Sequence, residues 1–400
     1  MDHPHHSAIW NKCFSKSRNR PYWFNSKTGE SVWEEPIVKR TGDPLAVPTS
    51  KRPKTTVAVH YNERKQETIA QRSTSSSIYI RSFNNWIKIV LLNETVRKIT
   101  LGEFDKYEKK GRYEDYYQNV TSSTLRAKEE ELKVISRHLG LYVMDLACGQ
   151  GGDLSKWEHL DVRDYVGFDI ADEAVNRARD RYKNAKRPFQ FSADFVVHDL
   201  SRPIPSLPHL KHHSRDIVSM QFALHYFFES EAKLRYLLAN IDQYLAPGGY
   251  FVGTTTDFKI IRQRIRESED ALSFGNDYYQ VSYGKDLRDL VQSQPSPMDF
   301  MNPYPPDVPP LPEFGLQYTF SLTDAVKELP EYIVQKEVMD KYAAQYSLVP
   351  CEWKNFHQYY YNNANQHMPL FQKMVGYGGS SPEWHTSEVY CVFVYKKYVE

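Results

Sequence analysis

The residues best suited to chemistry in this 400-residue chain lie in one stretch, LYVMDLACGQGGDLSKW, which spans residues 141–157. An apolar run that carries Asp145 leads into Gly149, Gly151 and Gly152, after which a helix-compatible segment opens. Glycine is needed where the backbone takes a positive φ or lets a ligand approach closely, and a helix start offers free N–H groups. The order therefore predicts a strand, a glycine turn and a helix that together hold a ligand.

A second acid indicates the kind of ligand. Asp169 ends the apolar run at residues 165–168 and lies 20 residues beyond Gly149, where a carboxylate can accept hydrogen bonds from two ribose hydroxyls. This combination predicts an adenosyl cofactor. In dinucleotide-binding enzymes the turn has the motif G-x-G-x-x-G, whereas in S-adenosylmethionine enzymes it has the motif D-x-x-x-G-x-G-G. This chain has the second motif, with Asp145 as its acid. An unrelated turn of another α/β domain is the alternative.

The elements that must position these residues alternate along the chain. Strands are predicted at residues 165–169, 195–199, 216–222 and 250–254, and helices at 171–184 and 229–245. Such alternation predicts an α/β fold with a mostly parallel sheet covered by helices on both faces, in which ligands bind at the carboxyl ends of the strands. Asp199, Gln221 and the pair His225-Tyr226 fall at or just after such ends. Two late strands are predicted at 316–322 and 389–395.

A helix is predicted before the glycine turn, around residues 81–90. Its apolar residues trace one face and leave Asn84, Asn85 and Lys88 near another, where they could contact a base or a carboxylate or could simply be solvated. The charged, Tyr-rich segment 102–133 is expected to form a surface insertion. The Pro-rich segment 283–313 shows no helix or strand periodicity, and we expect a second surface insertion there.

Composition sets the class of the protein. Hydrophobic residues make up 40% and charged residues 25%, as in ordinary globular proteins, and the length suffices for a main domain and a small extra one. The net charge of +1 excludes a global basic field, so any nucleic-acid contact must be local. The four cysteines lie far apart and the apolar runs are short, which argues against zinc, disulfides and membrane spans. We expect a soluble intracellular protein without a metal ion.

The N-terminal segment, residues 5–38, forms a separate aromatic-rich pattern. Three short strands clasped by Trp10, Trp23 and Pro36 fit it, and the pattern resembles the WW domain, a small three-stranded all-β module. The resemblance implies that Tyr22 and Trp33 form a groove for a polyproline-type ligand. It also implies ligand-binding residues in the first turn, where phosphoserine-binding members of that family hold their anion. These residues are Ser15, Lys16 and Arg18. The alternative, that they are simply solvated turn residues, stays open.

Residues 39–55 have the composition of a linker, rich in Pro and Thr with isolated basic residues. The clusters Lys39-Arg40 and Lys51-Arg52-Pro53-Lys54 have the spacing of a two-part nuclear import signal. The sequence therefore indicates nuclear localisation, provided that the function elsewhere in the chain is a nuclear one.

Residues 56–398, within a domain predicted at 56–400, resemble the messenger-RNA cap guanine-N7 methyltransferase family. The shared stretches, in family order, are HYNER, RSFNNWIK, MDLACGQGGDLSKW, DIADEAVNRARDRY, QFALHYFFES, LAPGGYFVGTT, SFGNDYY, LPEYIV and TSEVYCVF. The resemblance implies a Rossmann-like methyltransferase with a mostly parallel seven-stranded sheet, S-adenosylmethionine as its cofactor and capped RNA as its substrate.

The resemblance also implies roles for individual residues. The cofactor positions are Lys88, Ala147, Gly149, Gly151, Asp169, Asp199, Leu200, Gln221 and Tyr226. The cap positions are Asn84, Asn85, Gln150, Lys156, Arg181, His225, Glu331 and Tyr390. Guanine N7 has a lone pair and no proton to lose, so Glu331, His225 and Tyr226 would act by positioning and electrostatics rather than as a general base. Proximity can supply roughly 7–11 kcal/mol, more than the few kcal/mol expected from a nearby carboxylate.

Two departures from the family pattern stand in the glycine turn. The family has Gly at the position of Ala147 and a phosphate-contacting Lys at that of Gln150, which predicts weaker cap and cofactor binding. A catalytically weak or dead WW-containing adaptor of the capping machinery is therefore the alternative function, and a methyltransferase for another acceptor is a third. The expected partners are capped RNA, a Pro-rich or phosphorylated Ser-Pro peptide such as the RNA polymerase II tail, and an activating subunit.

Overall fold

The computed structural model describes residues 10–15, 20–25, 31–32, 56–63, 75, 77–108, 139–268, 270–294, 310–324, 326–376 and 381–398. The chain divides into two compact units, residues 1–53 and 54–400.

The first unit contains a three-stranded antiparallel sheet in the order β1-β2-β3, formed by Trp10–Ser15, Arg20–Asn25 and Ser31–Val32. Cys13 lies opposite Tyr22, and Trp23 lies opposite Val32. This confirms the predicted three-stranded module. Ser15 ends β1 and Tyr22 lies within β2. The other predicted ligand residues, Lys16, Arg18 and Trp33, and the whole linker 39–55 lie outside the described residues.

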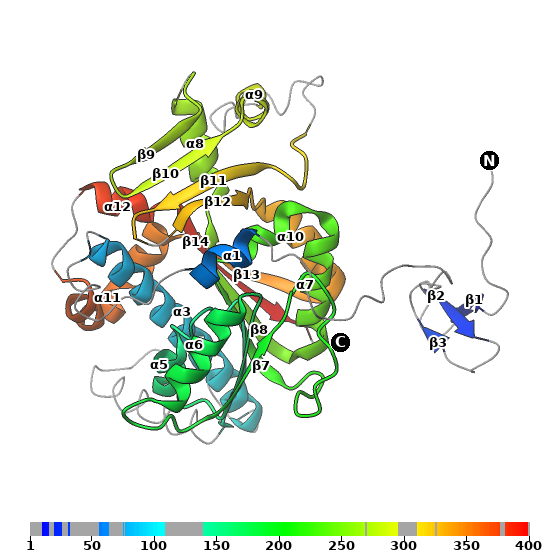
Figure 1. The fold of residues 1–400 in the computed structure, drawn as a ribbon. Helices are drawn as coiled ribbons and strands as arrows, with labels where there is room; N and C mark the ends of the chain where they lie inside the picture. The colour runs from blue at the N-terminus through cyan, green and yellow to red at the C-terminus, as the bar shows by residue number, and fades with distance from the viewer. Residues whose placement is uncertain are drawn as a thin grey trace. The chain divides into compact units, whose positions relative to one another are not determined.

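The second unit is built on a seven-stranded sheet, whose strands follow the order β13-β14-β8-β7-β4-β5-β6 (Figure 1). The five strands from β8 to β6 are parallel, and β14 and β13 add to the β8 edge in antiparallel orientation. This confirms the predicted mostly parallel sheet. The strands are β4 (Tyr142–Leu146), β5 (Asp164–Asp169), β6 (Ser192–Val197), β7 (Arg215–Gln221), β8 (Leu245–Thr256), β13 (Leu348–Asn355) and β14 (Tyr390–Lys397).

Helices cover both faces of this sheet, because its central strands are apolar on both sides. Val143 of β4 packs into one core with Trp86 and Trp157, whereas its neighbour Met144 packs into a second core with Leu237. The first face carries α3 (Ile78–Glu108), α5 (Leu154–His159), α6 (Asp172–Lys183) and α11 (Phe356–Met374), and the second carries α7 (Glu231–Tyr244) and α10 (Lys336–Ala343). The remaining helices are α1 (Thr56–Glu63), η2 (Leu224–Glu229), α8 (Phe258–Glu267), α9 (Lys285–Ser293), η3 (Ala344–Tyr346) and α12 (Ser381–Ser387).

A second, four-stranded sheet is antiparallel and was not predicted. Its order is β12-β11-β10-β9, formed by Val326–Tyr332, Gln317–Leu322, Tyr279–Tyr283 and Ser273–Asn276. It meets the main sheet at the carboxyl end of β8, where the hydroxyls of Thr256 and Tyr318 lie 2.9 Å apart. The second sheet therefore carries its side chains to the edge of the main sheet where ligands are expected.

Three predicted boundaries were wrong. Segment 102–133 begins inside α3, which continues to Glu108, and the rest of it lies outside the described residues. The strand predicted at 195–199 ends at Val197, because Asp199 accepts a hydrogen bond from the N–H of Ser201 and turns the chain. The segment 283–313 opens with helix α9, and residues 295–309 lie outside the described residues. None of the helices in the described part of the chain combines the length and apolarity needed to cross a membrane.

Candidate active site

The glycine turn between β4 and α5 has the left-handed backbone that its sequence predicts. Ala147, Gly149 and Gly151 have φ values of 58°, 52° and 68°. A Cβ at Gly151 would lie 2.8 Å from Leu154 Cδ1 and 3.2 Å from Ala178 Cβ, so this position has room for glycine alone. A Cβ at Gly149 would meet nothing within 4 Å, so the turn is open on the side that a ligand would approach.

Asp169, at the end of β5, is fixed against this turn. Its Oδ2 accepts the N–H of Gly149 at 2.8 Å, and its Oδ1 accepts the N–H of Ala171 at 2.9 Å. Burial raises the pKa of Asp169, and these backbone donors partly offset the rise. Each carboxylate oxygen can accept a further hydrogen bond. The open glycine turn and this oriented carboxylate fit the adenosyl cofactor that the sequence predicts.

The other predicted cofactor residues lie at the carboxyl ends of neighbouring strands. Gln221 ends β7 and accepts a hydrogen bond from the Thr254 hydroxyl at 3.1 Å. Asp199 lies in the loop after β6 with a half-buried side chain, and its Oδ2 lies 3.4 Å from Nε of Arg202. Leu200 is buried in the second core. The parallel sheet thus brings the ends of β4, β5, β6 and β7 to one edge.

A buried carboxylate that the sequence analysis did not assign lies just after the turn. Asp153 Oδ1 is 2.7 Å from Lys88 Nζ and 2.6 Å from Lys156 Nζ. The amine of Lys156 also donates to Oδ1 of Asn85 at 3.0 Å. Burial by itself raises the pKa of Asp153, but the two ammonium groups outweigh it and hold the pKa well below its usual range. One carboxylate shared by two ammonium groups leaves a positive charge that can receive an anion. In the sequence, Asp153 could have been noticed from its position at the start of the predicted helix.

Asp145, the acid inside β4, is buried beneath the turn. It accepts a hydrogen bond from the Tyr165 hydroxyl at 3.0 Å. Burial, and then the charge of Asp153, raise the pKa of Asp145 to about 7. Through this contact with Tyr165, Asp145 helps to fix the strand that leads into the glycine turn.

His225 of η2 and Glu331 of β12 meet at the junction of the two sheets. His225 Nε2 lies 3.4 Å from Glu331 Oε1, and both side chains are buried. Burial raises the pKa of Glu331 to about 8 and lowers that of His225 to about 3. Near neutral pH the pair is therefore uncharged, with a neutral imidazole beside a protonated carboxyl group, rather than an ion pair.

Neither ring nitrogen of His225 has a hydrogen-bond partner among the residues that the structure describes. A buried polar group without a partner costs free energy, so this pair is arranged for a ligand that supplies partners. One aromatic ring packs against this pair, because the His225 and Tyr226 centroids are 4.4 Å apart. The buried ring of Tyr390 packs against that of Phe222, with their centroids 5.0 Å apart. The arrangement suits a flat heteroaromatic base with donors on one edge.

Two tyrosines that the sequence analysis did not assign contact Glu331 and Tyr226. The hydroxyl of Tyr318 donates to Glu331 Oε2 at 2.8 Å. The hydroxyl of Tyr61, on α1, lies 3.4 Å from that of Tyr226. Tyr61 stands in the shared stretch HYNER, which could have indicated it. Tyr318 had no such signal, because its partner is set by the pairing of β11 with β12.

The remaining predicted cap positions lie around the glycine turn. Gln150 is half-exposed within it. Arg181 lies one helical turn beyond Ala178, the residue of α6 nearest to Gly151. Asn84 has a buried side-chain oxygen that meets no hydrogen-bond donor in the described part of the chain. In the described part of the chain no three His, Cys, Asp or Glu side chains are grouped as metal ligands.

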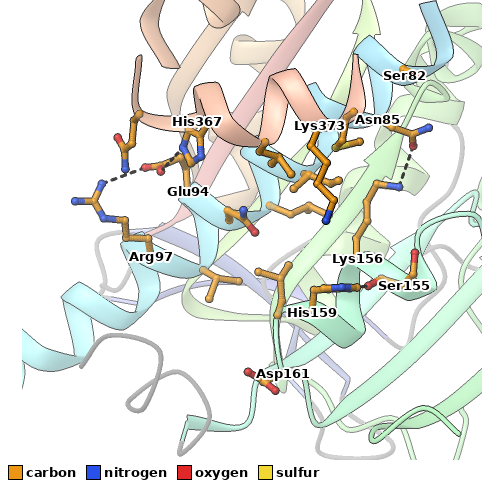
Figure 2. A pocket seen from close by; sticks show the side chains of 18 of the residues that line it. Ser82, Asn85, Glu94, Arg97, Ser155, Lys156, His159, Asp161, His367 and Lys373 are labelled. Carbon is orange, nitrogen blue, oxygen red and sulfur yellow. Dashed lines mark hydrogen bonds and ion pairs between the residues drawn. The ribbon is translucent and has the colours of Figure 1, made fainter. Parts of the chain in front are cut away.

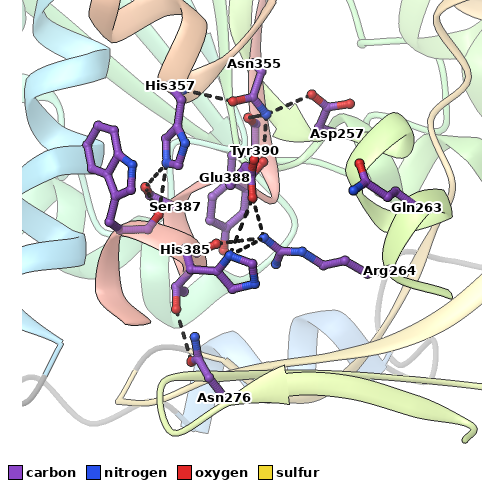
Figure 3. A network of polar contacts seen from close by, with 12 residues as sticks. Asp257, Gln263, Arg264, Asn276, Asn355, His357, His385, Ser387, Glu388 and Tyr390 are labelled. Carbon is purple, nitrogen blue, oxygen red and sulfur yellow. Dashed lines mark hydrogen bonds and ion pairs between the residues drawn. The ribbon is translucent and has the colours of Figure 1, made fainter. Parts of the chain in front are cut away.

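A polar network holds the start of β14, which bears Tyr390 (Figure 3). Asn355 Nδ2 donates to Asp257 Oδ2 at 3.0 Å and to the carbonyl oxygens of Glu388 at 2.7 Å and Tyr390 at 3.2 Å. Arg264 donates to Glu388 Oε2 at 2.6 Å. The backbone that presents Tyr390 is therefore held directly by Asn355 and, through the side chain of Glu388, by Arg264.

Comparison with known proteins gives matches along most of the chain. The model of the mRNA (guanine-N(7))-methyltransferase domain matches residues 47–106 and 118–398, and that of the WW domain matches residues 8–36. The mRNA cap guanine-N(7) methyltransferase 1 of Oryza sativa is 30% identical over 356 residues, which cover 85% of this chain and 80% of the relative. The mRNA cap guanine-N(7) methyltransferase of Drosophila melanogaster is also 30% identical, and the match covers 82% of this chain and 66% of the relative.

A solved structure of an S-adenosylmethionine-dependent methyltransferase from Clostridium acetobutylicum is also similar, at 12% identity and a TM-score of 0.39, over 70% of this chain and 94% of that chain. The family match spans more than half of the chain, and the open glycine turn with Asp169 provides the cofactor side of such a site. The chain belongs to the mRNA (guanine-N(7))-methyltransferase family, whose members are S-adenosylmethionine-dependent enzymes, and it carries a WW domain.

Proposed function

We propose that this protein methylates N7 of the guanine cap of messenger RNA by positioning and electrostatics, without a general base. The observation that carries the proposal is the buried pair His225 and Glu331. It offers an unpartnered imidazole and a carboxyl group at the ligand-binding edge of the sheet. Guanine presents an acceptor, O6, beside two donors, N1–H and the N2 amine, and so can supply partners to both residues.

The glycine turn and the strand ends around it would hold the cofactor. Asp169 accepts hydrogen bonds from the ribose hydroxyls of the cofactor, and the backbone of Gly149 and Gly151 lets the cofactor approach closely. Lys88 contacts the carboxylate of the cofactor. The full proposed set is Lys88, Ala147, Gly149, Gly151, Asp169, Asp199, Leu200, Gln221 and Tyr226. S-adenosylmethionine, when bound, supplies the electrophilic methyl group.

Glu331 would read the guanine and stabilise the charge that appears on it. It must release its proton to accept N1–H and N2–H, and these donors favour the ionised form. The resulting carboxylate stabilises positive charge on the methylated ring by a few kcal/mol. His225 donates to O6 from its neutral ring, and Tyr226 and Tyr390 confine the base. Holding N7 in line contributes more, roughly 7–11 kcal/mol.

The cap triphosphate would lie by the positive cluster around Asp153. Lys156 is held there by Asn85, and Arg181 flanks the same turn. Asn84 offers an amide whose oxygen has no partner within the described ranges. Gln150 can donate a hydrogen bond but brings no charge.

The direct test is incubation with labelled S-adenosylmethionine and GpppA-capped RNA, followed by nuclease digestion. Label recovered as 7-methyl-GpppA supports the proposal, whereas label in an internal nucleotide contradicts it. Glu331→Gln is the matched control, because it keeps the shape of the side chain but cannot ionise.

The second candidate, a weak or dead adaptor, is favoured by one observation, the left-handed φ of Ala147, and total inactivity of the folded wild-type protein would support it.

We also propose the layout and the partner of the N-terminal part: a WW domain at residues 5–38, a linker with a nuclear import signal at 39–55 and the methyltransferase domain at 56–400. The WW domain would bind a Pro-rich or phosphorylated Ser-Pro peptide, such as the RNA polymerase II tail, through Tyr22, Trp33 and the turn that holds Ser15, Lys16 and Arg18. Titrating the full-length protein with phosphorylated and unphosphorylated tail peptides tests the phosphate contact. Equal affinity for the two peptides would remove it.

A further inference from the structure

A cavity of about 870 Å³ lies between α3, α5 and α11, and neither His225 nor Glu331 is among the residues that line it (Figure 2). Its apolar floor includes Ile89, Leu92 and Met374, and its rim is polar. It is large enough for more than one nucleotide and is not needed for the chemistry at N7.

The cavity continues from the proposed phosphate site. Asn85 and Lys156, which are hydrogen-bonded to each other at 3.0 Å, form part of its wall. From Asn85 the lining follows α3 past Arg97, 12 residues further along the same helix. At 1.5 Å per residue this is a path of about 18 Å. Whatever follows the cap phosphates therefore has a groove to enter.

The charges on the lining favour an anion. Lys156, Arg97 and Lys373 are cationic, whereas Glu94 and Asp161 are anionic. Glu94 is paired with Arg97 at 3.4 Å and with His367 at 3.2 Å, and Lys156 is paired with Asp153 at 2.6 Å, so these charges largely balance. Lys373 is exposed, extends toward the side of the cavity on which Lys156 lies (Figure 2), and has no ion-pair partner in the part of the chain that the structure describes. Lys373 thus has its full charge available for a ligand.

We propose that this cavity, the transcript groove, binds the first nucleotides of the capped RNA. Their phosphates meet Lys373 and then Arg97, and their sugars and bases lie on the apolar floor. A positive groove with apolar contacts suits single-stranded nucleic acid of any sequence. The inference rests on the proposed function, because it places the RNA that follows the cap bound at Glu331.

The test compares two substrates, the cap dinucleotide GpppA and a capped oligoribonucleotide. We expect Lys373→Glu to raise KM for the capped oligoribonucleotide about tenfold, because one charge-assisted hydrogen bond is removed, and to leave KM for GpppA unchanged. The slope of log KM for the RNA against log salt should fall by about 0.7, since one phosphate fewer is neutralised by the protein. Lys285→Glu, an exposed lysine on α9 outside the cavity, is the control with the same change in charge.

A second variant locates the path of the RNA. Arg97→Glu, at the far side of the cavity, should weaken only longer capped RNAs, whereas Lys373→Glu should also weaken short ones. Fluorescence anisotropy with a labelled capped oligoribonucleotide measures binding without activity. If neither cap substrate is methylated but Lys373→Glu still weakens RNA binding, the proposed function fails and the groove stands. Two results would contradict the assignment of this groove to RNA. In one, Lys373→Glu changes KM equally for GpppA and for the capped oligoribonucleotide. In the other, the RNA measurements do not change, as expected if the groove binds a protein partner.

Discussion

Tyr318 stands directly opposite Glu331 in the pairing of β11 with β12, and its hydroxyl donates to Glu331 Oε2 at 2.8 Å. The Thr256 hydroxyl lies 2.9 Å from that of Tyr318, and Thr256 is in turn paired with Tyr390 across β8 and β14. Tyr318 is therefore a positioning residue: it fixes the carboxyl group of Glu331, for which we propose the role of reading the base, and links it to the main sheet.

We predict that Tyr318→Phe lowers kcat/KM for the cap about tenfold, since a hydrogen bond to a charged group contributes roughly 1.5–3 kcal/mol. KM for S-adenosylmethionine should stay unchanged. Losing the donor destabilises the carboxylate, so the rise of kcat/KM with pH should move to higher pH. A variant that loses activity with an unshifted pH profile would show that Tyr318 supports only the fold.

Cap affinity should depend on pH through Glu331. The free protein holds a proton on this group below its pKa of about 8, and the proton must leave before guanine can donate to both oxygens. Affinity for a cap analogue should therefore rise as the pH rises to about 8 and then level off. Calorimetric titrations from acidic to alkaline pH measure this. His225, with a pKa of about 3, does not titrate in that window.

The same carboxyl group should lower the stability of the free protein. Its pKa is about 8 in the folded state against 4.5 for an ordinary Glu, so between these values the folded protein holds a proton that the unfolded chain has lost. Stability must then fall as the pH rises through this window. We predict that Glu331→Gln unfolds at a higher temperature than the wild type at pH 8, with the difference shrinking toward pH 5. Glu328→Gln, an exposed change on the same strand, should show no such trend.

Replacing Ala147 with glycine should stabilise the protein. A residue other than glycine at a φ of 58° costs of order 1 kcal/mol, and Ala147→Gly removes this cost. We expect a higher melting temperature and a lower KM for S-adenosylmethionine. Ala171→Gly, at a φ of −89°, is the control and should destabilise the fold. Equal effects at the two positions would mean that backbone strain is not the cause.

Gln150→Lys should strengthen cap binding. The side chain is half-exposed in the glycine turn, and an ammonium there adds a charge toward the proposed phosphate site. We expect a lower KM for GpppA and a steeper dependence of that KM on salt. If neither quantity changes, position 150 does not contact the phosphates.

The local parts of this site could be predicted from the sequence. The strand, glycine turn and helix around Gly149 depend on residues close in sequence and on glycine's freedom at positive φ. The second sheet could not be predicted, because β10 and β11 are separated by α9 and the segment 295–309. The partner of Tyr318 depends on that pairing, so its role appeared only in the folded chain. Asp153 was missed because its partner Lys88 lies 65 residues away.

The position of Asp153 between two lysines has a consequence for how the substrates bind. Lys88 belongs to the proposed cofactor set and Lys156 to the proposed cap set, yet both amines contact the same carboxylate oxygen. An anion that draws one lysine away leaves Asp153 to the other and lowers the positive charge offered at the second site. If the two substrates bind at these proposed sites, their affinities are linked, and such a linkage is reciprocal by thermodynamic necessity.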